Sequence, residues 1–192
     1  ADGRITLGQL LTPGWRLPKL LDVFLSCCET GLGSPSQTDD VLTLSTGFLC
    51  AGAISVVSTL WAVDDIAAAL FSIRYHQYRQ KLDRSTALQK AQQYIRDMSG
   101  AELARQYKQP IITLLDQKFE VAEAKRRQAE EKIQQFCVDT QHYREWQEKH
   151  DFWAEVAIRI DDTQTRLKAL CREALPFSHP TYWAGFISQG LR

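Results

Sequence analysis

A stretch near the N-terminus indicates the fold most directly: Leu21-Asp22-Val23-Phe24-Leu25-Ser26-Cys27-Cys28-Glu29-Thr30-Gly31. Its first five residues have the apolar character of a short buried strand, and the Gly, Ser and Pro residues that follow it break that pattern. In α/β proteins, ligands bind beyond the carboxyl ends of the strands, so a thiol at this point would face a crevice rather than the core. Alternation along the strand does not decide whether Cys27 or Cys28 points outward.

Downstream of this strand, the pattern alternates between helix and strand. The expected elements are a helix over about 40–51, a strand over 54–61, a helix over about 64–80, a helix capped by Ser85 or Thr86 and ending near 98, and a strand over 182–188. The residues of the first helix that we expect to face inward are Val41, Leu44, Phe48 and Leu49. This order predicts an α/β fold with a mainly parallel sheet flanked by helices.

Residues 100–176 differ from the rest of the chain in composition. They are rich in Glu, Lys, Gln and Arg, and no Gly occurs between Gly100 and Pro176. Apolar residues recur at helical spacing, which predicts one helix from Ile111 to about Lys149 and a second over 152–174, paired as an antiparallel hairpin. We therefore expect a core over 1–99, a helical hairpin insertion over 100–175 and a closing strand of the core over 176–192.

Composition excludes several classes of partner and site. The 192-residue chain has 23 basic and 23 acidic residues, so no net field attracts nucleic acid or an anionic membrane. Its five cysteines are odd in number and show no metal-ligand spacing with histidine, which is typical of reduced thiols in a cytoplasmic protein. We expect no signal peptide at the N-terminus. We expect a cytoplasmic location and neither a metal nor a cofactor.

One uncharged stretch, Val41 to Val63, is long enough to span a bilayer. It contains many Ser, Thr and Gly residues, and acidic pairs at 39–40 and 64–65 flank it without Lys or Arg. Such flanks are not typical of a membrane anchor, so we expect no membrane segment here.

Residues 25–31 resemble the Leu-Ser-Ala-Cys-Glu-Thr-Gly signature of the CHAT family, caspase-like cysteine peptidases of bacteria that often follow tetratricopeptide repeats. Cys28 stands at the position of the nucleophile in that signature, and Cys27 replaces the usual alanine. Residues 48–65 resemble the family's Ala-Gly-Ala…Leu-Trp-x-Val-x-Asp stretch, and residues 179–186 its closing His-Pro-x-x-Trp-Ala-x-Phe strand. Residues 87–92 are a weaker match to an Ala-Leu-x-x-Ala-Gln helix. The shared order of these blocks is more specific than any one of them.

The resemblance implies a caspase-like fold and an endopeptidase that cleaves a protein substrate through a thioester acyl-enzyme at Cys28. The backbone N–H of Cys28 would stabilise the oxyanion. We expect the other four cysteines to be small buried apolar residues. Caspase-like enzymes take their base from a His-Gly turn that precedes the nucleophile, whereas all four histidines here follow Cys28. The catalytic histidine is therefore expected in an upstream segment, and His179 is expected to orient the turn into the last strand.

Asp64 and Asp65 follow the expected strand at 54–61 and allow two interpretations. They are suited to the N-terminus of the next helix, where a carboxylate accepts backbone hydrogen bonds and favours the helix dipole. Several relatives of the caspase fold instead use a carboxylate to bind a basic P1 residue, which would make Asp64 and Asp65 substrate-binding.

A different class of function is also consistent with the residues. In this alternative the fold is a non-catalytic caspase-like module, the hairpin binds a regulatory protein, and the thiol is incidental. An α/β enzyme of another kind is less favoured because the chain has neither a Gly-rich phosphate loop nor a metal cluster.

Overall fold

The computed structural model describes residues 5–17, 19–25, 43–138 and 140–190. Cys27 and Cys28 lie outside these residues. The chain divides into two compact units: unit 1 consists of Ala1–Met98 and Phe177–Arg192, and unit 2 of Ser99–Pro176. Most of the chain is helical, and unit 1 contains a small sheet.

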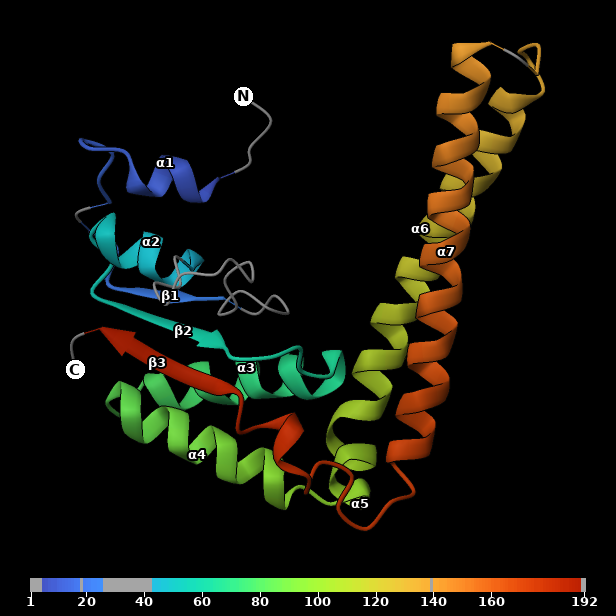
Figure 1. Ribbon diagram of the computed structural model, residues 1–192. Helices are drawn as coiled ribbons and strands as arrows, with labels where there is room; N and C mark the ends of the chain where they lie inside the picture. The colour runs from blue at the N-terminus through green and yellow to red at the C-terminus, as the bar shows by residue number, and fades with distance from the viewer. Residues whose placement is uncertain (1–4, 18, 26–42, 139, 191–192) are drawn as a thin grey trace. The chain divides into compact units, whose positions relative to one another are not determined.

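The sheet of unit 1 has three strands in the order β1-β2-β3: β1 (Asp22–Phe24), β2 (Ser55–Thr59) and β3 (Phe186–Gly190) (Figure 1). β1 and β2 are parallel, as expected, whereas β2 and β3 are antiparallel. The described sheet is therefore mixed rather than mainly parallel, because β3 enters it beside the carboxyl end of β2, where Phe186 is opposite Thr59. β3 also begins later than the predicted strand, since Pro180–Tyr182 form a 3-10 turn.

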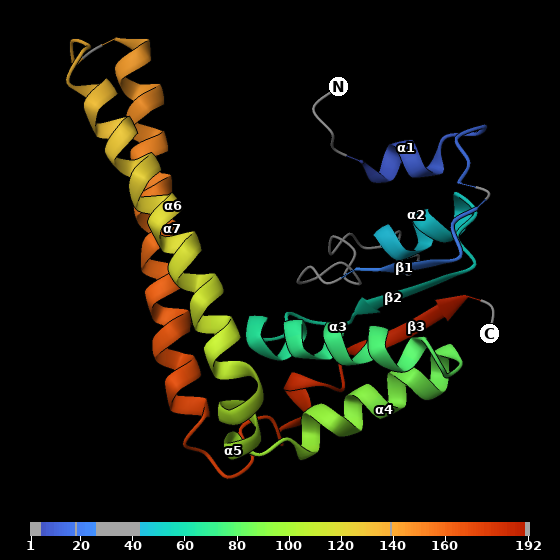
Figure 2. The same ribbon diagram turned by 180° about the vertical axis from the view of Figure 1, so that it is seen from behind.

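Helices cover both faces of this sheet. α1 (Leu7–Leu11) and α2 (Leu44–Cys50) lie on one face, and α3 (Asp65–Arg79) and α4 (Arg84–Asp97) lie on the other (Figures 1 and 2). The predicted helix over 64–80 is confirmed as α3. The cap of α4 is Asp83 rather than Ser85 or Thr86, because the Asp83 carboxylate accepts hydrogen bonds from both of those hydroxyls and from the Thr86 backbone N–H.

The core of unit 1 is centred on β2, all five residues of which are buried. The Phe71 ring of α3 stacks on Phe186 of β3 with 3.6 Å between ring centroids, and Phe24 of β1 lies beside both rings. This aromatic cluster holds the two outer strands, β1 and β3, against α3.

The inward face of α2 differs from the prediction. Ser45 and Gly47 are buried, whereas Leu44, Phe48 and Leu49 are only half-buried, and Val41 lies outside the described residues. The reason is contact with α1: a Cβ at position 47 would lie 2.7 Å from a methyl carbon of Leu7. A glycine therefore faces inward where a helical pattern alone favours a large apolar side chain.

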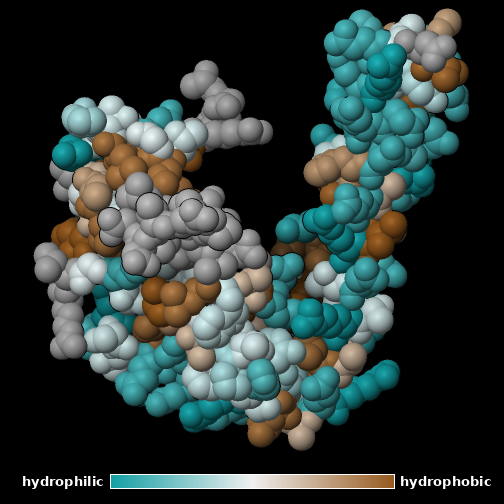
Figure 3. Space-filling view, in the orientation of Figure 1, coloured by the Kyte–Doolittle hydropathy of each residue, from teal (hydrophilic) through white to brown (hydrophobic). Residues whose placement is uncertain are grey.

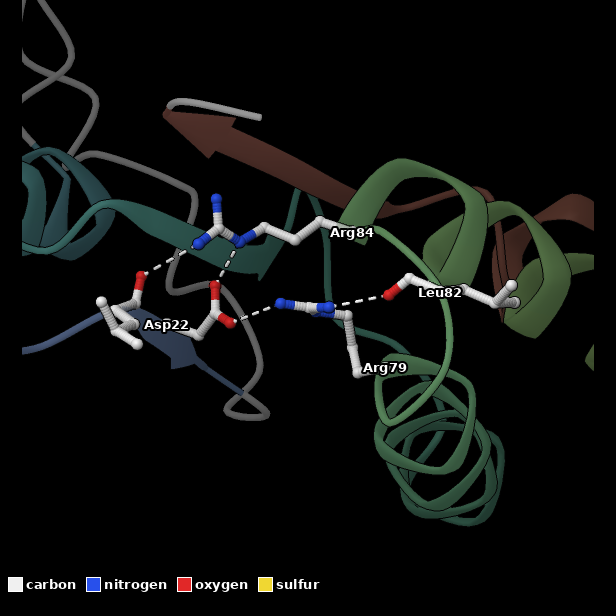
Figure 4. Close-up of polar contacts among 5 residues, drawn as sticks. Asp22, Arg79, Leu82 and Arg84 are labelled. Atoms are coloured by element: carbon white, nitrogen blue, oxygen red, sulfur yellow. Dashed lines mark hydrogen bonds and ion pairs between the residues drawn. The ribbon is translucent and has the colours of Figure 1, made fainter.

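An ionic cluster joins the amino end of β1 to the end of α3 and the start of α4 (Figure 4). The Asp22 carboxylate pairs with Arg79 at 2.9 Å and with Arg84, and Arg79 also donates to the Leu82 carbonyl oxygen at 2.8 Å. Burial, followed by the charge of Asp22, raises the pKa of the nearby Tyr75 phenol. These contacts hold the amino end of β1 against the end of α3 and the start of α4.

Unit 2 is a helical hairpin with a short helical base. It contains α5 (Gly100–Leu103), a π-helical turn (Ala104–Lys108), α6 (Gln109–Ile133) and α7 (Gln141–Leu170). α6 and α7 are antiparallel: Gln164 donates to Asp116 at 2.6 Å, and the Nζ of Lys125, later in α6, lies over the ring of Trp153, earlier in α7. The expected hairpin is present, but its predicted turn near 149–152 is wrong: the chain turns between 134 and 140, and Thr140 caps α7.

The hairpin has a narrow core and a closed base. Ala122, Ala157 and Ile160 form a buried cluster between the two helices. At the base, the Gly100 N–H donates to the Glu173 carbonyl oxygen at 3.2 Å, and a Cβ on Gly100 would lie only 2.3 Å from that oxygen. Only glycine fits this approach. None of the helices in the described part of the chain has both the length and the apolar character needed to cross a bilayer.

Candidate functional site

The carboxyl ends of β1 and β2 lie at one edge of the sheet, because the two strands are parallel. Leu25 extends the pairing beyond β1, since its N–H donates to the Val57 carbonyl oxygen at 2.8 Å. Cys28 comes three residues later in the sequence. The structure thus locates the strand end that leads to Cys28, while the thiol itself lies outside the described residues.

Asp64 stands at the N-terminus of α3, beyond the carboxyl end of β2. One of its carboxylate oxygens accepts hydrogen bonds from the backbone N–H groups of Ile66 and Ala67 at 3.1 and 3.0 Å. This confirms the capping interpretation for Asp64. Asp65 is exposed in the first turn, where its charge favours the positive end of the helix dipole. Binding of a substrate side chain by either carboxylate stays a prediction.

Trp61 joins this edge to the segment that precedes β3. Its indole N–H donates to the Thr181 carbonyl oxygen at 3.0 Å, and the Leu60 N–H donates to the Gly185 carbonyl oxygen at 2.9 Å. The indole also lies against Gly185, where a Cβ would be 2.8 Å from a ring carbon. Two sequence blocks about 120 positions apart are therefore packed together at the carboxyl end of β2.

Gln92 of α4 holds the same segment from another direction. Its side-chain amide donates to the carbonyl oxygens of Trp183 and Phe186 at 3.3 and 3.0 Å. These hydrogen bonds explain why a half-buried amide occurs on a helix face that packs on the sheet. The three sequence blocks that contain Trp61, Gln92 and His179 thus form one structural cluster, which we call the edge cluster.

His179 has a structural role in this cluster, as expected. Its Nδ1 lies 2.8 Å from the Thr181 hydroxyl and accepts from the Thr181 N–H at 3.4 Å, which caps the 3-10 turn. His76 lies on α3 beside Phe24, the last residue of β1, with 5.2 Å between ring centroids. His142 and His150 belong to α7 of unit 2.

The cysteines differ from the prediction in their exposure. Cys50 and Cys137 are exposed, because Cys50 ends α2 and Cys137 lies in the turn between α6 and α7. Cys171 is half-buried, and burial raises the pKa of its thiol. Cys27 lies outside the described residues. Within the ranges that the structure describes, no cluster of His, Cys, Asp and Glu side chains is suited to hold a metal ion.

Comparison with protein families gives one result that spans the chain. The family model of the CHAT domain matches residues 1–191. No curated protein and no solved structure matches the chain.

Proposed function

Because this chain belongs to the CHAT domain family, a caspase-like peptidase family, we propose that it is the nucleophile-bearing part of a cysteine endopeptidase. The observation that carries this proposal is the strand end that precedes Cys28 in the sequence. Leu25, three residues before Cys28, pairs with Val57 at the edge where Asp64 and the edge cluster lie. Ligands bind at such edges in α/β proteins.

The reaction that we propose is hydrolysis of a peptide bond in a protein substrate. The Cys28 thiolate attacks the scissile carbonyl carbon, and the backbone N–H of Cys28 stabilises the resulting oxyanion. The C–N bond then breaks, the amine leaves with a proton from the catalytic base, and a thioester links the acyl group to Cys28. Water, deprotonated by the same base, hydrolyses the thioester and regenerates the thiol.

The base in this proposal is a histidine from a segment upstream of residue 1. The family resemblance assigns the base to a strand that precedes the nucleophile. The contacts of His179 are consistent with this assignment, since its Nδ1 is used in its own turn. In this view unit 2 is an insertion in a caspase-like core.

Asp64 and Asp65 supply the proposed specificity. A carboxylate at this edge of the sheet would pair with Lys or Arg at P1 through charge-assisted hydrogen bonds. Asp65 is exposed and adds negative charge to the same helix N-terminus. We therefore propose that these two residues bind a basic P1 side chain.

Two proteins test the proposal: the 192-residue chain, and a longer protein that adds the segment with the histidine. We expect the chain alone not to cleave peptides, because a cysteine thiol is mostly protonated at neutral pH without a base. The longer protein should cleave them, and Cys28→Ala should abolish cleavage while Cys27→Ala should not. Cleavage by the chain alone that is lost in Cys28→Ala would make His179 the leading base. A longer protein that is inactive would favour the interaction module instead.

A further inference from the structure

The hairpin of unit 2 has an apolar groove between α6 and α7. The groove encloses about 480 Å³, and Trp153, Val156 and Ile160 of α7 face Leu114 and Val121 of α6 across it. Leu114 and Val121 are 52% and 53% exposed, which is high for large apolar residues. In Figure 3 the surface of the hairpin is largely hydrophilic, with hydrophobic patches along it.

The shape of the groove fits a third helix. Its apolar residues on α6 span two helical turns, about 10 Å, and those on α7 recur at the spacing of one helix face. A helix that lies between two antiparallel helices places side chains at i, i+3, i+4 and i+7 into such a groove. Trp153 supplies the kind of large, half-buried aromatic surface that dominates binding energy at interfaces.

The charges around the groove indicate which helix it binds. Lys118 and Arg159 line the groove, and none of its lining residues is acidic. Lys125 does not line the groove, but its Nζ lies 5.4 Å from the centre of the Trp153 ring. Glu155, the partner of Arg159, does not line the groove and is well exposed. The second groove of the hairpin differs, since Glu123, Arg126 and Asp161 give it charges of both signs.

These charges also argue against a second copy of this chain as the occupant. Two grooves placed face to face would bring together Lys118 and Arg159 of both copies, without a carboxylate among the lining residues. Like charges at a desolvated interface cost several kcal/mol, roughly. We propose that the groove binds an amphipathic helix of another protein, with apolar residues in the groove and carboxylates opposite Lys118 and Arg159. This inference is independent of the proposed peptidase activity.

A peptide library tests the proposal on the full chain. The peptides are 18-residue helix formers with Leu at the i, i+3, i+4 and i+7 positions and Glu, Gln or Lys at the flanking positions. They are displayed and selected against the immobilised Cys28→Ala variant, so that cleavage cannot affect the result. We expect Glu to be enriched at the flanking positions and binding of the selected peptides to weaken as salt rises.

Two exposed aliphatic residues on different sides of the hairpin provide a matched pair of variants. Leu114→Glu should weaken binding of the selected peptide at least tenfold, whereas Ile158→Glu, at a position 63% exposed in the second groove, should leave it unchanged. Lys118→Glu combined with Arg159→Glu should shift the selection to Lys-flanked peptides. Circular dichroism checks that each variant keeps its helices.

Three outcomes would overturn the proposal. The first is a selection without enrichment, or with enrichment of Lys by the unsubstituted groove. The second is an equal effect of Leu114→Glu and Ile158→Glu. The third is a dimer in analytical ultracentrifugation that Leu114→Glu dissociates, which would identify a second copy as the occupant.

Discussion

Replacing Gly185 by alanine tests whether the edge cluster is a rigid part of unit 1. A Cβ at this position would lie 2.8 Å from one carbon of the Trp61 ring and 3.1 Å from two further ring atoms. The ring has little freedom to move away, because its N–H donates to the Thr181 carbonyl oxygen. The methyl group must therefore either displace the indole or separate β3 from β2.

The expected destabilisation follows from these two contacts. Overpacking of a well-packed site costs about 1–3 kcal/mol, and loss of the Trp61 hydrogen bond adds about 1 kcal/mol. We expect the free energy of unfolding of unit 1 to fall by about 2–4 kcal/mol. At roughly 4 °C per kcal/mol for a unit of this size, its melting temperature should fall by about 8–16 °C.

Hydrogen exchange measured by mass spectrometry on β2 and β3 reports the stability of unit 1 separately from that of the hairpin. Gly8→Ala is the matched control, since the nearest atom to its Cβ is 4.0 Å away and the helical position favours alanine. In a Trp61→Leu background, Gly185→Ala should cost much less. The reasoning fails if Gly185→Ala is as mild as Gly8→Ala, or if its cost is the same with and without the indole.

In the active protein, Asp64→Asn or Asp65→Asn should lower the preference for Lys and Arg at P1 by about tenfold to a hundredfold, because a charge-assisted hydrogen bond contributes about 1.5–3 kcal/mol. Stability should change little, because Asn also caps helices. A peptide library in which both variants keep the wild-type preference would contradict this prediction. After the two exposed cysteines, Cys50 and Cys137, are replaced by serine, Cys28 should react with iodoacetamide faster than the remaining thiols. Mass spectrometry locates the label, and faster labelling of another cysteine would refute the activation of Cys28. Asp83→Ala should destabilise the protein at neutral pH, because hydrogen bonds from Thr86 hold the pKa of the Asp83 carboxyl below its usual range. The stability that this carboxylate contributes is present above about pH 4 and is lost as the pH falls toward its lowered folded-state pKa, so the melting temperatures of wild type and variant should converge in acid.

Local signals explain the parts of the fold that could be predicted. α3 was predictable because Asp64 caps it and its apolar residues keep one period from Ile66 to Tyr75. The turn between α6 and α7 was not predictable, because apolar residues continue at helical spacing past residue 134. Nothing in the sequence around Thr140 distinguishes this helix cap from a Thr inside the polar helical segment. Contacts between distant segments decide such details, and one sequence does not contain them.

The candidate site shows the same division. The sequence blocks predict Cys28 and Asp64 as site residues, and the parallel pairing of β1 and β2 brings the strand ends that precede them in the sequence to the same edge. The direction of β3 and the two carbonyl groups bound by Gln92 depend on packing between α4 and the sheet, over more than 90 positions of sequence. In the sequence, the only local indication of that contact was a glutamine, Gln92, on an otherwise apolar helix face.

The hydrogen bond between Gly100 and Glu173 has a consequence for the order of folding. β3 must pair with β2 across all of unit 2, and such non-local pairing is slow because the entropy of closing the loop comes first. The contacts of the hairpin lie within unit 2, so we expect it to form without the sheet, and its closed base then brings its two ends together. Replacing roughly 75 flexible residues by a few lowers the closure cost by about 2–3 kcal/mol. We therefore expect unit 2 to act as a folded spacer that helps the last strand to pair with the sheet.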